Sequence, residues 1–314
     1  MIYYHKVNMS KYFDKKNCFL EPLVSEYGSS IVMTNVNKPT KIKYLNVDTR
    51  FTDDFTTNKQ CLSGTKYIIT FPEQINDVLS LKLETIELPL SFNNVSSQLG
   101  NDNFLMTRVS DGARVNIRIK ENYYDYESLR STSLLTNLPL GVTCKIDDLD
   151  KWSFTNTSSE SYIINFAVDV SGNTDKNQFK SKLGWLIGFR DVEYSLLPSS
   201  SLVGESLVNY SPMRYVYVVL DEFTNSFQNS FSSFYEKSIM NKKILAKVGL
   251  GDVNYQRHSM MSINCNNGPI CSDTRNYNGK IDIKRINVEL VNEWGKCLNM
   301  RGDDISFLLK IEHE

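Results

Sequence analysis

Residues 113–120 read Ala-Arg-Val-Asn-Ile-Arg-Ile-Lys, and apolar and polar side chains alternate at every position of this stretch. Successive side chains of a β-strand point to opposite faces of a sheet, so strict alternation predicts a strand with one buried and one wet face. Such strands are typical of antiparallel sheets, because helices usually cover both faces of a parallel sheet. The stretch therefore predicts an antiparallel β-fold.

The same alternation recurs along the chain on both sides of this stretch. The apolar positions are Tyr67, Ile69 and Phe71, then Tyr162, Ile164, Phe166, Val168 and Val170, and finally Ile305, Phe307, Leu309 and Ile311. Residues 215–220 are apolar throughout, which is typical of a central strand. In the resulting sandwich of two facing sheets we expect five core residues, namely Val115, Ile117, Phe166, Val218 and Phe307.

Two segments change the phase of their alternation in mid-strand. Leu79, Leu81 and Leu83 are followed by Ile86 and Leu88, so the apolar face slips by one residue near position 85. A second slip, near 284–285, separates 281 and 283 from 286, 288 and 290. A one-residue slip would turn the core face outward unless a β-bulge absorbs it. We expect a bulge in each segment.

Helices are few in this pattern. Residues 126–135 follow a candidate N-cap, Asp125, and we expect a short helix there. In residues 179–189 a helical stripe is formed by Phe179, Leu183, Leu186 and Ile187. Gly184 and Gly188 lie beside that stripe and predict a close approach to a sheet. The sequence thus predicts an all-β antiparallel sandwich with two short helices.

The first part of the chain differs from the rest. Charged pairs, Gly and Pro interrupt every short apolar group before residue 42. We therefore expect residues 1–41 to form an N-terminal arm and residues 42–314 to form a single β-domain. Met1 is not followed by the apolar region of a signal peptide, and no apolar run is long enough to span a bilayer. We expect synthesis in the cytoplasm and no membrane span.

The charge balance excludes a dedicated nucleic-acid binder. The 314 residues include 35 Lys and Arg against 36 Asp and Glu, which gives a net charge of −1 and no basic excess. With 41% hydrophobic and 23% charged residues, the chain has the composition of a globular protein. Its 31 Asn and 34 Ser residues suit many strands joined by polar loops.

No catalytic, cofactor-binding or metal site is predicted. The three histidines, His5, His258 and His313, fall in no motif of nucleophilic catalysis. Carboxylate clusters at 53–54, 147–150 and 303–304 lack the spacing of a calcium loop, so we interpret them as turn residues. We therefore predict that the protein is not an enzyme and carries no cofactor.

Three short motifs have structural interpretations. Arg301-Gly302-Asp303 matches an integrin-binding tripeptide, but we interpret it as a turn before the last strand. Asn94, Asn156 and Asn209 begin glycosylation sequons that should stay unmodified without a signal peptide. Cys265 and Cys271 flank a Gly-Pro turn, and the sequence leaves open whether they are bridged or reduced.

Trp185 and Arg190 are the candidate site residues. Both residue types are enriched at interface hot spots, so they could anchor a partner protein. In the other interpretation they belong to a helix packed on a sheet, with Arg190 at its C-terminal end. The apolar stripe beside them favours the packing role.

Ten blocks of the sequence resemble a family of virion proteins. The blocks are 46–56, 67–72, 75–89, 100–104, 183–190 (L-G-W-L-I-G-F-R), 215–223 (Y-V-Y-V-V-L-D-E-F), 244–247, 288–295, 298–299 and 304–312. In this order they are similar to β-rich minor capsid or penton (vertex) proteins of large nucleocytoplasmic DNA viruses. The sequence departs from the family pattern at 277–280, where no Pro follows the Gly, and at Ile305, where an aromatic residue is usual.

The resemblance implies a fold, a function and a location. It implies a jelly-roll sandwich and a structural role in the capsid of the virion, with no active site to carry over. The implied partners are major and minor capsid proteins and further copies of the chain, as in a pentamer. It does not distinguish a penton from another minor capsid position. The alternative is a binding module on the particle surface that recognises host glycans or receptors.

Overall fold

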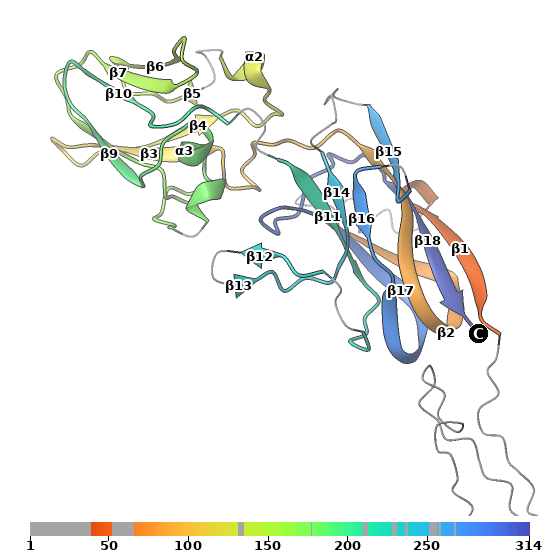
Figure 1. Cartoon of the computed structure of the whole chain (residues 1–314). Coiled ribbons are helices and arrows are strands. Elements are labelled where there is room, and N and C mark those ends of the chain that lie inside the picture. The colour runs from red at the N-terminus through yellow and green to blue at the C-terminus, as the bar shows by residue number, and fades with distance from the viewer. Residues whose placement is uncertain are drawn as a thin grey trace, which may run out of the picture. The chain divides into compact units, whose positions relative to one another are not determined.

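The computed structural model describes residues 39–51, 66–130, 135–176, 178–209, 213–227, 231–235, 238–250, 256, 259–266 and 268–314. This part of the chain is all-β, with antiparallel strands and two short α-helices (Figure 1). The predicted fold class is therefore confirmed. Residues 1–38 lie outside the described residues, so the N-terminal arm stays a prediction, and so do the predicted domain bounds.

Eight strands form the largest sheet. They are β1 (Lys41–Asp48), β2 (Lys66–Pro89), β11 (Tyr215–Asp221), β14 (Ile244–Gly249), β15 (Met260–Asn264), β16 (Ile270–Ser272), β17 (Arg275–Asn292) and β18 (Ser306–His313). The order is β1-β18-β2-β17-β11-β14-β16, and β15 pairs with β2. A 3-10 helix, Thr49–Phe51, follows β1. All pairings within the sheet are antiparallel, as the alternation predicts.

The two longest strands, β2 and β17, bend within the sheet, and Figure 1 shows β17 turning back on itself. The first part of β2 pairs with the last part of β17, whereas its second part pairs with β18 and β15. The sheet therefore curls, and apolar residues from both halves face one core. Val218, Ile286 and Phe307 are buried there.

The predicted phase slips coincide with register shifts. Thr85 pairs with Leu308 and Leu83 with Leu309, so Glu84 is the extra residue of a bulge. A second shift leaves Leu79 without a partner in β18, and Leu79 is half-buried. The expected place of Leu79 on the core face is thus wrong, because this bulge puts Val78 there instead. The pairing of β17 with β2 also shifts between Ile283 and Arg285.

Residues between β2 and β11 form two smaller antiparallel sheets. One contains β5 (Leu135–Thr136), β4 (Arg114–Ile119), β3 (Asn103–Arg108), β8 (Tyr162–Asn165) and β9 (Glu193–Leu196), and the other contains β10 (Ser200–Val203), β7 (Trp152–Asn156) and β6 (Val142–Ile146). They share a second core, in which Ile117 and Phe166 are fully buried. Val115 is only half-buried at its margin, so the predicted burial of this residue is not met.

A short hairpin lies on the outer face of the large sheet. It consists of β12 (Phe234–Tyr235) and β13 (Ser238–Ile239). Tyr217 and Val219, which point away from the main core, pack in a small apolar cluster with Met240 at the base of the hairpin. The Tyr217 hydroxyl lies 3.0 Å from the Ser233 hydroxyl. This covering explains why the central strand β11 is apolar on both faces.

Both predicted helices are shorter than expected. Helix α2 spans Tyr126–Leu129 and begins at the predicted cap, Asp125, whose carboxylate accepts the backbone N–H of Ser128. Residues 131–134 lie outside the described residues. The predicted helix at 179–189 is interrupted: a 3-10 helix spans Phe179–Ser181, and α3 spans only Leu183–Leu186. Lys182 between them is extended.

Candidate interaction site

Lys182 interrupts the predicted helix because its side chain is buried. The Lys182 ammonium donates to the backbone oxygen of Val168 at 3.0 Å and to the carboxylate of Asp175 at 2.7 Å. A helical backbone at this position would direct the ammonium elsewhere, since side-chain direction follows backbone conformation. A buried ammonium needs such partners, so the tertiary contact overrides the local helical pattern.

The single turn of α3 presents different residues to the core and to the surface. Leu183 and Ile187 are buried in the second core, and Gly184 lies against the ring of Phe166. A Cβ atom added at Gly184 would lie 2.3 Å from Cγ of Phe166, which accounts for the glycine. Trp185 is half-buried, so it does not share the burial of Leu183 and Ile187.

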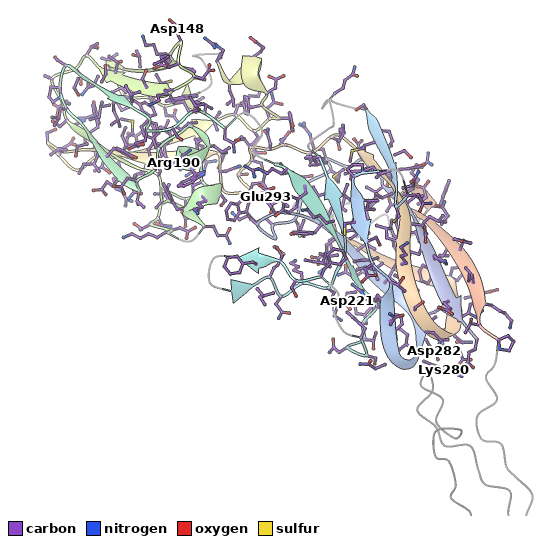
Figure 2. The ribbon with its side chains drawn as sticks, in the orientation of Figure 1. Asp148, Arg190, Asp221, Lys280, Asp282 and Glu293 are labelled. Carbon is purple, nitrogen blue, oxygen red and sulfur yellow. The ribbon has the colours of Figure 1, made fainter. Side chains whose placement is uncertain are left out.

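The structure brings the two candidate site residues together. The guanidinium carbon of Arg190 lies 4.2 Å from the centre of the Trp185 ring. The Arg190 guanidinium also donates to the backbone oxygens of Trp185 and Phe189, at 2.9 and 3.1 Å. The carbonyls at the end of a helix favour a cation. The Arg190 guanidinium thus covers one face of the Trp185 ring. Figure 2 labels Arg190 beside α3.

Tyr194 and Glu205 fix the backbone that follows α3. The Arg190 backbone N–H lies 3.0 Å from the Tyr194 hydroxyl oxygen and 3.1 Å from a Glu205 carboxylate oxygen. Tyr194 donates its hydroxyl to Glu205 at 2.6 Å. Burial, followed by the Glu205 contact, raises the pKa of Tyr194. The position of Arg190 over Trp185 is therefore set by contacts outside the helix.

Trp185 lines a cleft of about 540 Å³. Residues after α3 and around the ends of β11 and β17 complete its walls, and Phe234 of the β12–β13 hairpin stands at its margin. Tyr215 and Trp294 add two further aromatic side chains to the lining. Figure 2 labels Glu293, which lies just beyond the end of β17. The lining combines aromatic rings with Met213 and Arg214, which are residue types enriched in protein interfaces.

Three charged side chains line the cleft, and they differ in their surroundings. Glu293 is half-buried, and its carboxylate accepts the backbone N–H of Arg214 at 3.1 Å. Burial raises the pKa of Glu293 above its usual range. Lys180 and Arg214 are exposed, and the Lys180 ammonium lies 5.5 Å from the centre of the Trp185 ring. Burial and a hydrogen bond with Tyr217 raise the pKa of Tyr215 to about 12.

A buried ionic network in the large sheet has no counterpart in the sequence predictions. Arg275 donates to the Glu222 carboxylate at 2.7 Å, and the Tyr277 hydroxyl donates to the same oxygen at 2.6 Å. The Arg275 and Glu222 side chains are 3% and 0% exposed. Burial and the nearby Glu222 carboxylate raise the pKa of Tyr277 far above its usual range. In the sequence, the one sign of this network is Glu222, a carboxylate that directly follows the strand β11.

Further acceptors complete the surroundings of Arg275. Its guanidinium also donates to the backbone oxygens of Leu220, Lys243 and Ile244, and it lies 4.3 Å from the centre of the Phe227 ring. A buried charge that makes this many contacts positions the strands that supply them. The network thus connects β11, β14 and β17 inside the sheet.

The remaining sequence motifs have structural positions. Asp147 accepts the backbone N–H groups of Leu149 and Lys151 in a turn, as expected for a turn carboxylate. Gly302 has a φ of +88° in the turn before β18, which confirms the interpretation of the Arg-Gly-Asp motif as a turn. The Asn94 and Asn156 side chains are buried, and their amides are engaged in hydrogen bonds.

Other candidates are apart from the cleft or outside the described residues. Cys265 and Cys271 are free thiols, so the alternative of a disulfide between them is not seen. His313 lies at the end of β18, whereas His5, His258 and the 53–54 carboxylates lie outside the described residues. In the described part of the chain, no group of three or more His, Cys, Asp or Glu residues could hold a metal ion. Among its helices, none is long and apolar enough to cross a membrane.

Comparisons with known proteins give likenesses among solved structures. No family model matches the chain, and neither does any curated protein. The crystal structure of a mavirus penton protein superposes on 86% of this chain and 99% of its own, with 12% sequence identity and a TM-score of 0.39. A likeness at this level does not by itself establish a common fold or function.

Proposed function

We propose that the protein is a structural component of a virion capsid, a jelly-roll penton or minor capsid subunit that acts by assembling with other subunits. The observation that carries this proposal is where the resembling sequence blocks lie. Blocks 67–72 and 75–89 form β2, and blocks 215–223, 244–247, 288–295 and 304–312 contribute to β11, β14, β17 and β18. Segments spread over the chain therefore meet in one sheet.

This placement supports a structural role for the resembling residues. They contribute the buried side chains Val218, Leu290 and Leu309, and the block 215–223 also contains Glu222 of the ionic network. Residues that build a sheet and its internal contacts serve the framework of the protein. In the proposed role the protein performs no catalysis and binds no cofactor or nucleic acid.

The proposed partners are proteins of the same capsid. They are the major capsid protein, other minor capsid proteins and further copies of this chain, with a pentamer as the form expected at a vertex. The protein would be made in the host cytoplasm and reside in the virion. In this role Trp185 and Arg190 contact a partner, and the cleft that Trp185 lines, with Arg190 stacked on the Trp185 ring, is the proposed contact site.

The oligomeric state of the purified full chain tests the proposal. We expect rings or higher assemblies in light scattering and negative-stain images, alone or with the major capsid protein. A particle reconstruction should place the chain in the capsid lattice or at its vertices. A chain that stays monomeric with every capsid protein and is missing from purified particles would overturn the proposal.

Two variants separate folding from assembly. Trp185→Ala should retain the circular dichroism spectrum and melting temperature of the parent chain while losing assembly. Leu149→Ala is the matched control, because Leu149 is a 72% exposed apolar residue in a turn that does not line the cleft. If Trp185→Ala fails to fold, the residue serves packing and does not anchor a partner.

The alternative of a surface module that recognises glycans makes a different prediction. The isolated full chain would then bind defined saccharides on a glycan array without any capsid partner. Specific saccharide binding by a chain that is monomeric and does not enter capsids would support this alternative over the capsid role.

A further inference from the structure

Two exposed apolar side chains lie on the β12–β13 hairpin, and one of them, Phe234, lines the cleft. Phe234 and Ile239 are opposite each other across the β12–β13 hairpin, and their exposed fractions are 81% and 63%. Directly paired residues of an antiparallel pair point to the same face of the sheet, so the two side chains form one apolar surface. Apolar surface exposed in this way next to an aromatic cleft is a candidate for contact with a partner.

The apolar margin favours a protein over a saccharide as the occupant. Saccharides stack on aromatic rings and satisfy their hydroxyls with polar groups, and an aliphatic side chain such as Ile239 offers neither contact. Large apolar side chains of a partner protein would instead be removed from water against Phe234, Ile239 and Trp294. The exposed hairpin therefore points to a protein partner.

The charges of the cleft indicate the polar character of that partner. Lys180 and Arg214 are exposed, and neither forms an ion pair with any described residue. The one lining carboxylate, Glu293, already accepts a backbone N–H from Arg214. The exposed charges of the cleft are thus cationic, and carboxylates of a partner would complement them.

The volume of the cleft limits the size of the occupant. A cleft of about 540 Å³ falls in the range of pockets that hold small ligands or a few side chains. A folded domain could not enter it, whereas an extended segment could place one large side chain inside and its neighbours at the margin.

We propose that the cleft binds an extended segment of a partner protein in which an aromatic or large aliphatic side chain is flanked by Asp or Glu. The large side chain packs between Trp185, Trp294 and Phe234, and the carboxylates lie near Lys180 and Arg214. If the partner is a neighbouring capsid subunit, the inference rests on the proposed function. That the cleft binds such a segment does not depend on the proposed function.

Blocked synthetic peptides added to the full chain provide the test. One probe carries a central Phe between two Glu residues, and the second carries the same Phe between two Lys residues. Neither probe contains Trp, so a change in the tryptophan fluorescence of the protein reports binding, and calorimetry measures the affinity. We expect the Glu peptide to bind roughly ten-fold more tightly, with an advantage that shrinks as salt is added.

Charge reversal in the cleft provides the internal control. In the double variant Lys180→Glu, Arg214→Glu the preference should invert, so that the Lys peptide binds more tightly. Lys145→Glu is the matched variant, since Lys145 is exposed on β6 and does not line the cleft, and it should leave the preference unchanged. Circular dichroism and melting temperature confirm that each variant is folded.

Three results would overturn the inference. They are a lack of binding by both peptides, equal binding of the two peptides, and a preference that survives the charge reversal. Binding of a glycan in this cleft in place of either peptide would also contradict it. If neither peptide binds but the chain assembles with capsid proteins, the bound segment is rejected and the capsid role stands. If the Glu peptide binds but the chain does not assemble, the bound segment stands and the capsid role is rejected.

Discussion

Arg275 and Glu222 lie far apart in the sequence and meet in an ion pair that is almost completely removed from water. Water cannot replace either partner at this depth, so the loss of one leaves an uncompensated charge. Asp221 and Lys243 form a second pair of similar length nearby, but their side chains are 31% and 25% exposed. The two pairs allow the effect of burial on an ion pair to be measured within one sheet.

Replacing Arg275 with Met should lower the free energy of unfolding by about 3–5 kcal/mol, because the buried Glu222 carboxyl would lose its partner. The matched replacement Lys243→Met should cost less than about 1 kcal/mol, since solvent screens the Asp221 carboxylate. Urea denaturation followed by circular dichroism measures both. Equal costs for the two variants would show that burial does not determine the contribution of the Arg275 pair.

In the folded protein the buried Cys144 should be less reactive than the exposed Cys271. Burial raises the pKa of its thiol to about 11, so at pH 8 only about one thiol in a thousand is ionised, and the thiolate is the reactive form. Reactivity should therefore rise only as the pH approaches 11. We expect iodoacetamide to label the exposed Cys271 first at pH 8, as read by peptide mass spectrometry. Denaturation in urea should abolish the difference.

The bulge in β2 keeps two apolar runs of this strand on one face of the sheet. Glu84 is the extra residue, and its removal would pair Thr85 with Leu308 directly after Leu83 with Leu309. The alternation through Leu83 and Ile86 would then be regular, with the same residues facing the core. Lys82 lies outside the bulge, so its removal would shift one part of the strand by one residue and turn that part's core side chains outward.

Deleting Glu84 should therefore be tolerated, with a loss of about 1–3 kcal/mol of unfolding free energy from local contacts. Deleting Lys82 should prevent folding or cost more than about 4 kcal/mol. Soluble yield and thermal melting of the two deletion variants provide the measurement. Similar behaviour of both variants would mean that the bulge at 84 does not maintain the register of β2.

The approach of α3 to the second core depends on Gly184. Replacing Gly184 with Ala should cost about 1–3 kcal/mol, because the new Cβ would overlap the Phe166 ring. A smaller partner should relieve the overlap, so the double variant Gly184→Ala, Phe166→Leu should lose less than the sum of the two single losses. Chemical denaturation of all four proteins completes the cycle, and strict additivity would exclude the contact as the cause.

Two large hydrophobic cores and one small apolar cluster organise the described strands. The second core is built from one continuous part of the chain. The core of the large sheet is built mainly from residues that precede this part in the sequence and from residues that follow it. β1 belongs to the first core through Val47, and it pairs with β18 over all eight of its residues. The pairing of the described chain with the large sheet thus begins at Lys41, the first residue of β1.

Removal of residues 1–38 should leave the melting temperature within about 2 °C of the parent value, because the sequence of this segment lacks the apolar alternation of the strands. Removal of residues 1–48, which also deletes β1, should lower the melting temperature much further, since β18 would lose its partner and Val47 its place in the core. Differential scanning calorimetry compares the two truncations. A large loss from the shorter truncation would place the arm in the folded core.

Local features of the fold could be predicted from the amino-acid sequence alone. Alternation at 67–71 and 305–311 predicted antiparallel strands, and the phase slip near 85 predicted the bulge at Glu84, because these features depend only on neighbouring residues and on the period of a strand. The Asp125 cap and the turn at Gly302 were predictable for the same reason. The predicted role of Trp185 and Arg190 stays a prediction.

Which distant segments meet became known from the three-dimensional structure and not from the sequence. The division into two cores, the Arg275–Glu222 pair and the cleft shared by Trp185 and Trp294 join residues tens to more than a hundred positions apart, and no local pattern encodes such contacts. Packing also overrode a local preference at Lys182, where burial of one ammonium between Val168 and Asp175 divided a helix that the apolar stripe predicted to be continuous. Burial and long-range pairing set these outcomes, since their energies depend on partners that neighbouring residues do not specify.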